Sequence, residues 1–231
     1  MLKEFTENKE ILINSLLGTI FADGSICKAR NKSYKDKAYL EIAHTSKNLD
    51  YLEFKKTLLE KLPDVTCKIV QHNKKTENKQ YLLFRLVTNS TSEFRYIRDD
   101  IYTFKDNLRI KKFPKEYIYR FNDLSLYLLY LDDGTIRIRY KEGSNKLREA
   151  RISFCLNSFK LNEIIDFKNF LKERYNIDSK YYKFRNTKYG DNTGFVLWLN
   201  TFNSRKFLEI IDKFYELVPS MKYKFLKYYS L

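Results

Sequence analysis

LLGTIFADG, from Leu16 to Gly24, and LYLLYLDDG, from Leu126 to Gly134, lie about half the chain apart and share one pattern. Each is an apolar run that ends in an aspartate, Asp23 or Asp133, directly before a glycine. Such nearly continuous apolar runs predict helices that are buried on most faces. Gly18 destabilises a helix, so it indicates close approach of another backbone. We therefore expect the two helices to pack against each other, with both aspartates at the same end.

The residues that follow each motif repeat as well. A basic stretch suited to a strand and turn comes first, then a second strand, an amphipathic helix, two strands and a third helix. Each half ends in a basic tetrad, Leu108 to Lys111 and Met221 to Lys224. The nearly constant offset between these landmarks indicates an internal duplication. Phe54 and Lys55 are expected to take the places of Phe167 and Lys168.

This repetition predicts an α+β fold of two pseudo-symmetric αββαββα halves. The halves should form a saddle of antiparallel sheets, with the motif helices packed at the central interface. The N-terminal half is expected over residues 1–105, a linker over 106–122 and the C-terminal half over 123–231. Because the chain has few prolines and no linker rich in glycine and serine, the halves should form one rigid unit.

The charge of the chain indicates a polyanionic partner. Lysine and arginine number 44 against 29 acidic residues, for a net charge of +15. This excess favours nucleic acid, and the codon bias of an AT-rich gene explains it poorly. The three isolated cysteines argue against a disulfide framework or a zinc site. Without a signal pattern or an apolar stretch long enough for a membrane, the chain is expected to be intracellular. The composition is typical of an AT-rich genome such as that of an organelle, a bacterium or a phage, and the sequence does not choose among these.

Two carboxylates at the ends of packed helices favour a bound cation. A carboxylate at a helix C-terminus faces the negative end of the helix dipole, and a second one beside it adds repulsion. One apolar helix ending in Asp-Gly is usually only a helix and a turn. The duplicated pair, Asp23 and Asp133, predicts a site for Mg²⁺, with Mn²⁺ as a substitute, because hard cations prefer oxygen ligands.

At this point the motifs resemble those of single-chain LAGLIDADG homing endonucleases. The first motif matches the family pattern closely, and the second departs from it at Leu128 and Asp132. The resemblance implies a monomeric, site-specific endonuclease that hydrolyses both strands of DNA across the minor groove. It also implies short 3′ overhangs at a long asymmetric target.

The resemblance also implies the roles of particular residues. The metal ligands would be the carboxylates of Asp23 and Asp133 and the backbone carbonyls of Ala22 and Asp132. A lysine late in each half is a further catalytic candidate, to stabilise phosphate charge or orient water; here these are Lys111 and Lys224. An ordinary phosphate contact or a solvated surface lysine is the alternative. Weaker candidates for positioning water are Thr45, Ser46 and Asn157.

Strand alternation predicts which residues face DNA. In TIRIRYK, isoleucines alternate with Arg137, Arg139 and Lys141, whose side chains should enter a major groove. The first half is ambiguous, because Ile26 places Cys27, Ala29 and Asn31 toward DNA while composition favours Lys28, Arg30 and Lys32. An early strand break or a bulge would reconcile the two. Further candidates are Arg85, Lys183 and Arg185.

Two other functions remain open from the residues alone. The same family includes maturases, which bind intron RNA as splicing cofactors and need the basic surface without the aspartates. A DNA-binding regulator with idle sites is the third reading. Cleavage of a cognate duplex, and its loss on changing either aspartate, distinguishes the nuclease from both.

Overall fold

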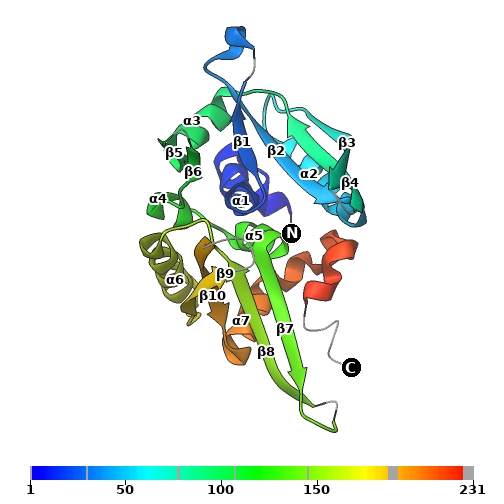
Figure 1. The fold of residues 1–231 in the computed structure, drawn as a ribbon, viewed down its shortest axis with the longest axis vertical. Coiled ribbons are helices and arrows are strands. Elements are labelled where there is room, and N and C mark those ends of the chain that lie inside the picture. Colours follow the sequence, from blue (N-terminus) through cyan, green and yellow to red (C-terminus); the bar gives the residue numbers. More distant parts are fainter. Residues whose placement is uncertain are drawn as a thin grey trace.

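The computed structural model describes residues 2–29, 31–76, 79–106, 108–144, 146–186 and 192–225. At residues 32, 73–76, 79–81, 184–186 and 192–193 it describes the backbone alone. Two four-stranded antiparallel sheets lie on opposite sides of a central helix pair, α1 and α5 (Figure 1). The molecule therefore consists of two sheet-containing halves joined through these helices.

The N-terminal half follows the predicted order. Its sheet has the strand order β1-β2-β4-β3. Its elements are α1 (Lys9–Phe21), β1 (Ser25–Lys28), β2 (Ala38–Thr45), α2 (Leu49–Leu59), β3 (Cys67–Thr76), β4 (Lys79–Thr88) and α3 (Ser92–Ile101). Short 3₁₀ turns are η1 (Lys3–Phe5), η2 (Lys32–Tyr34) and η3 (Ser46–Asn48).

The C-terminal half repeats this order, with the sheet β7-β8-β10-β9. Its elements are α5 (Asp123–Asp133), β7 (Gly134–Tyr140), β8 (Leu147–Cys155), α6 (Leu161–Tyr175), β9 (Lys180–Asn186), β10 (Asn192–Leu199) and α7 (Thr201–Ile211). Two 3₁₀ segments follow, η4 (Asp212–Leu217) and η5 (Pro219–Lys224). The predicted αββαββα order is thus confirmed in both halves.

The connection between the halves contains structure that the sequence did not predict. β5 (Tyr102–Lys105) pairs with β6 (Leu108–Lys111) as an antiparallel hairpin, and the short helix α4 (Lys115–Ile118) follows. The predicted boundary after residue 105 falls inside this hairpin. Pairing of Tyr102 with Lys111 ties the start of the expected linker to the end of α3. The hairpin therefore sets the position of Lys111.

The two motif helices pack with unusually close backbones. A Cβ atom on Gly18 would lie 1.9 Å from the carbonyl oxygen of Ser125, so only glycine fits there. The Ser125 hydroxyl donates to the carbonyl of Asn14 at 2.6 Å, and the Asn122 amide donates to the Ser15 hydroxyl at 2.9 Å. The prediction that Gly18 meets another backbone is confirmed.

Each sheet has one covered and one open face. On β2, Leu40 and Ile42 are buried, while Glu41 and Ala43 point to the other face and are more exposed. We call this second side, which carries Glu41 in one half and Arg137 in the other, the open face. None of the helices in the described residues is long and apolar enough to span a membrane.

Strand register defines which residues are equivalent in the two halves. Ser25 pairs with Glu41, and Thr135, which follows the second motif as Ser25 follows the first, pairs with Ser153. Helix α6 begins as far after Ser153 as α2 begins after Glu41. Lys55 is therefore equivalent to Phe167. The expected match of Lys55 with Lys168 is wrong by one position, because short aromatic-basic pairs do not define a helix register.

Candidate active site

The two motif aspartates lie where the central helices end. Helix α1 stops at Phe21, so Asp23 lies in the turn before β1, whereas Asp133 is the last residue of α5. Burial raises the pKa of Asp133 to about 7, and the nearby charges of Asp23 and Asp132 raise it further. Burial and the charge of Asp132 also raise the pKa of Asp23. The fold thus brings several acids together without fully neutralising Asp23 and Asp133.

Lys111 and Lys224 hold the ends of the two helices in the same way. The Lys111 Nζ donates to the carbonyls of Ile20 at 2.8 Å, Ala22 at 3.1 Å and Gly24 at 2.7 Å. A cation at this position satisfies carbonyls that have no partner within the helix and opposes the helix dipole.

Lys224 makes the equivalent contacts at the end of α5. Its Nζ donates to the carbonyls of Leu131 at 2.6 Å and Gly134 at 2.7 Å, and its own carbonyl accepts from the Tyr130 hydroxyl. Burial lowers the pKa of both lysines, that of Lys111 to about 8, although the neighbouring aspartates oppose this shift. Both lysines therefore lie beside the acids, as caps of the helices that carry them.

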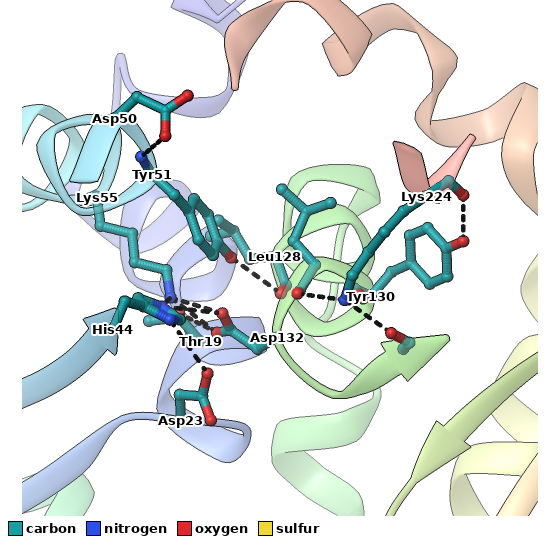
Figure 2. A network of polar contacts seen from close by, with 12 residues as sticks. Thr19, Asp23, His44, Asp50, Tyr51, Lys55, Leu128, Tyr130, Asp132 and Lys224 are labelled. Carbon is teal, nitrogen blue, oxygen red and sulfur yellow. Dashed lines mark hydrogen bonds and ion pairs between the residues drawn. The ribbon is translucent and has the colours of Figure 1, made fainter. Parts of the chain in front are cut away.

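A third aspartate, Asp132, lies inside a buried polar cluster (Figure 2). The Lys55 Nζ donates to its two carboxylate oxygens at 2.7 and 2.9 Å, and the Thr19 hydroxyl donates to Oδ2 at 2.5 Å. The side chains of Asp132 and Lys55 are both 0% exposed. Burial alone would raise the pKa of Asp132, but Lys55 and His44 outweigh it and lower the pKa to about 2. Asp132 is therefore ionised and paired.

His44 connects this cluster to Asp23. Its Nε2 lies 3.0 Å from the Lys55 Nζ, and its Nδ1 lies 3.8 Å from Oδ2 of Asp23. Ligand atoms of Asp23, His44 and Asp132 all lie within 4.8 Å of one another, a spacing that suits a metal ion. The Lys55 ammonium already neutralises Asp132, however. The carboxylates that still lack a full counter-charge are those of Asp23 and Asp133, which fit a divalent cation.

Sequence reasoning missed both the cluster and His44. From the sequence, Asp132 was expected to contribute only its backbone carbonyl, and no role was predicted for His44. His44 lies two residues after Ile42 on β2 and therefore on the covered face. His44 occupies a position of β2 at which the alternation of the strand predicts an apolar residue, and this departure could have indicated a buried polar cluster. Thr45, Ser46 and Asn157 are exposed at or just after the ends of β2 and β8.

The open face carries part of the predicted DNA-binding set. Arg137 and Arg139 are exposed on β7, and Lys141 directly follows that strand. Arg85 pairs with Ala43 in register and forms an ion pair with Glu41 at 3.1 Å. These four residues therefore lie on, or directly beside, the open faces of the two sheets.

Two predicted positions are wrong in register, and three lie beyond the description. Lys28 pairs with Ala38, which is buried on the covered face. Lys183 pairs with Phe195, which lies on the same face of β10 as the buried Leu197 two residues later. Both lysines therefore lie on the covered faces of their sheets. β1 ends at Lys28, which is the early strand break that the sequence allowed. Arg30 and the side chains of Lys32 and Arg185 lie outside the described residues.

The open face of the second half also contains a stacked arginine that was not predicted. The Arg151 guanidinium lies 4.1 Å from the centre of the Trp198 ring, and the Lys180 ammonium lies 5.9 Å from it. Arg151 also forms an ion pair with Glu149 at 3.1 Å. Stacking and pairing hold a cation in one orientation on this face.

Two open antiparallel sheets around a duplicated helix pair, with acids where the helices end, define a pseudo-symmetric α+β protein with one central site. The chain belongs to the LAGLIDADG DNA endonuclease family, whose model matches residues 13–207.

Two curated proteins named Protein RecA are similar in sequence: that of Mycobacterium gastri is 24% identical over 214 residues, covering 91% of this chain and 46% of that protein. That of Mycolicibacterium flavescens is 23% identical over 214 residues, covering 91% of this chain and 45% of that protein. The chain spans about half the length of these curated relatives.

Solved structures show the same fold. The homing endonuclease I-WcaI bound to its DNA recognition sequence has a TM-score of 0.71 and 17% identity, with 96% of this chain and 91% of that chain covered. I-DmoI in complex with DNA and Mn has a TM-score of 0.53 and 18% identity, with 88% and 97% covered. These likenesses confirm the architecture of two sheet-bearing halves.

Proposed function

We propose that this protein is a site-specific endonuclease that cuts both strands of duplex DNA at a long asymmetric target. Hydrolysis would occur across the minor groove and leave short 3′ overhangs. The observation that carries this proposal is the pair of incompletely neutralised acids, Asp23 and Asp133, between two open faces that carry arginines. The similar structures of I-WcaI and I-DmoI, each described as bound to DNA, support the same partner.

Asp23 and Asp133 would hold the divalent cation, with the carbonyls of Ala22 and Asp132 as further oxygen ligands. Their raised pKa values support this, because a carboxylate that is costly to ionise gains most from a bound cation. Mg²⁺ would activate a water and offset charge on the phosphate, and Mn²⁺ would replace it. The structure of I-DmoI with DNA and Mn is consistent with that choice.

The remaining residues would bind and position the duplex. Lys111 and Lys224 would hold the helix ends that present the acids and place positive charge near the scissile phosphates. Thr45, Ser46 and Asn157 are weaker candidates for orienting water. The groove contacts would come from Arg85, Arg137 and Arg139, with Arg151 added on the strength of its stacked geometry, and Lys141 would contact the DNA backbone beside them.

The test uses a duplex that the wild-type protein selects from a randomised DNA library in the presence of Mg²⁺. Wild type should cut both strands of the selected duplex, and EDTA should abolish cutting. Asp23→Asn and Asp133→Asn should each lose one or both cuts while still binding the duplex. Asp64→Asn is a matched control, because Asp64 lies in the exposed turn between α2 and β3 and its left-handed backbone accepts asparagine.

Two alternatives would be recognised by the same experiment. A maturase would bind intron RNA and support splicing when both aspartates are asparagine. A DNA-binding regulator would retain a duplex without cutting it, with or without metal. Two acids held together at a cost in folding free energy favour the nuclease, because neither alternative needs them. Unchanged cutting by both single variants would reject the assigned site.

A further inference from the structure

The buried polar cluster exists on one side of the central helix pair, and its equivalent on the other side is apolar. By the motif alignment and strand register, Thr19 corresponds to Leu129, His44 to Leu156, Lys55 to Phe167 and Asp132 to Ala22. Leu129, Leu156 and Phe167 are each 0% exposed. The same buried space is therefore filled by a hydrogen-bonded ion pair near Asp23 and by hydrocarbon near Asp133.

This difference is not explained by stability. Removing two charges from water costs free energy that their attraction only partly returns, and apolar residues of similar volume often stabilise a core more. The other half of this chain contains that apolar solution, with Phe167 packed 5.5 Å from Phe113 between ring centres. The polar version must therefore be explained by what its side chains do at the neighbouring acid.

The hydrogen-bond inventory fixes how His44 faces that acid. An ammonium only donates. The three protons of Lys55 serve the two oxygens of Asp132 and the Nε2 of His44. Nε2 is thus an acceptor, and the ring proton lies on Nδ1, which is 3.8 Å from Asp23 Oδ2. The Asp23 side chain is 39% exposed, so a small rotation brings its carboxylate within hydrogen-bond distance.

We propose that Lys55 and Asp132 hold His44 as a positioning residue that orients the Asp23 carboxylate, and that Asp133 has no equivalent. The inference rests on the proposed nuclease function and adds that the carboxylates of Asp23 and Asp133 are not equally well oriented. Asp132 belongs to the C-terminal half and the other members to the N-terminal half, so the device also depends on correct docking of the halves. One strand is then cut faster than the other, through a nicked intermediate.

The test measures the two strands separately. The probe is the duplex that wild type selects from the randomised library, with a different 5′ label on each strand and Mg²⁺ present. Wild type should accumulate a nick in one defined strand. His44→Leu, which copies the other half, should slow one strand by about 10- to 100-fold and the other by less than about threefold. Binding of the same duplex in Ca²⁺ should stay unchanged.

Two further variants separate positioning from packing. His44→Gln should keep the wild-type ratio of the two rates, because its amide accepts from Lys55 and donates toward Asp23. Leu156→Met, the matched change in the other half, should also leave the ratio unchanged, because the two residues have similar volumes. If His44→Leu does not fold, the double variant Lys55→Met, Asp132→Ala removes the pair without leaving a lone charge and should show the same strand bias.

Three results would overturn the inference. Equal slowing of both strands in His44→Leu would mean that the cluster only supports the fold. Unchanged rates would mean that His44 does not position Asp23. If wild type cuts both strands at the same rate, with no nicked intermediate, the proposed difference between the two strands does not exist. A wild type that cuts no duplex from the library would instead reject the proposed function, and the inference with it.

Discussion

Three neighbouring aspartates have different protonation behaviour because their partners differ. Asp132 accepts hydrogen bonds from Lys55 and Thr19, and although burial would raise its pKa, the neighbouring Lys55 ammonium lowers it to about 2. Asp133, one residue later, faces burial and two other carboxylates, which raise its pKa to about 7. Sequence adjacency therefore says little about charge, and helical rotation decides which acid meets which partner.

The raised pKa of Asp133 predicts a pH-dependent cost in the metal-free protein. A carboxyl whose pKa is higher in the folded than in the unfolded state supports folding fully below about pH 4 and loses that support as the pH rises through about 7. Asp133→Asn should therefore stabilise the protein in EDTA by up to about 4 kcal/mol at pH 9 and by about 1–2 kcal/mol at pH 5.

Urea unfolding at the two pH values measures this difference. Adding Mg²⁺ should reverse the ranking, because wild type then gains a bound cation that the variant holds poorly. Equal unfolding free energies of wild type and variant at both pH values would show that Asp133 is not strained by its neighbours.

At the scale of elements, the ends of α1 and α5 are the functional parts of the central helices. Each helix stops where a lysine from a distant segment, Lys111 from β6 or Lys224 from η5, binds its last carbonyls. Gly18 lets the two backbones approach until side chains no longer separate them. The acids are thus held by backbone contacts rather than by mobile loops.

Lys111→Met should lower the free energy of unfolding by about 2 kcal/mol, because four carbonyls lose a charged donor in a buried position. Lys105→Met, on the exposed strand that pairs with β6, is the control and should change it by less than about 0.5 kcal/mol. Denaturant unfolding measures both. A Lys111→Met protein with wild-type stability would leave only the catalytic role for this lysine.

The open face of the second sheet predicts two kinds of DNA contact. Arg151 is fixed between Trp198 and Glu149, so Arg151→Ala should relax the preference at one base pair by about 1–3 kcal/mol. Lys141 lies past the end of β7, and Lys141→Ala should weaken binding to all sequences alike and reduce its salt dependence. Binding to duplexes substituted at each position in turn measures both. Uniform weakening by Arg151→Ala would assign it to phosphate.

At the scale of the whole molecule, one chain contains both halves of the site. In a symmetric dimer, each subunit would supply one of the two central helices. Here α1 and α5 belong to the same polypeptide and are buried against each other. An asymmetric pair of halves can also read an asymmetric target, which a symmetric dimer cannot do with equal contacts.

The protein should therefore be a monomer of 28.0 kDa in solution and bind one duplex per chain. Mass photometry of the free protein and of the complex measures both quantities. Two chains on one duplex would show that the halves of a single chain do not form a complete binding surface.

The repeated motifs were sufficient to predict the fold because their information is local and occurs twice. Apolar runs indicate buried helices, strand alternation indicates which face of a strand is covered, and the glycine in α1 indicates a close contact. None of these inferences requires knowledge of the packing partner. The hairpin of β5 and β6 was missed because its strands are short and exposed, with little apolar pattern. Lys28 lies on the covered face, as the strand register set by Ile26 predicted and composition did not, and Lys183 was proposed without a register for its strand.

The amino-acid sequence by itself determined the duplicated αββαββα order, the packed motif helices and the placement of Asp23 and Asp133 at their ends. Only the tertiary structure decided that Lys55, His44 and Thr19 meet Asp132 from across the central helix pair. It also decided that Lys111 and Lys224 bind helix carbonyls. The physical reason is that these contacts join residues far apart in the chain, and their energies depend on burial and distance, which arise only once the two halves have docked.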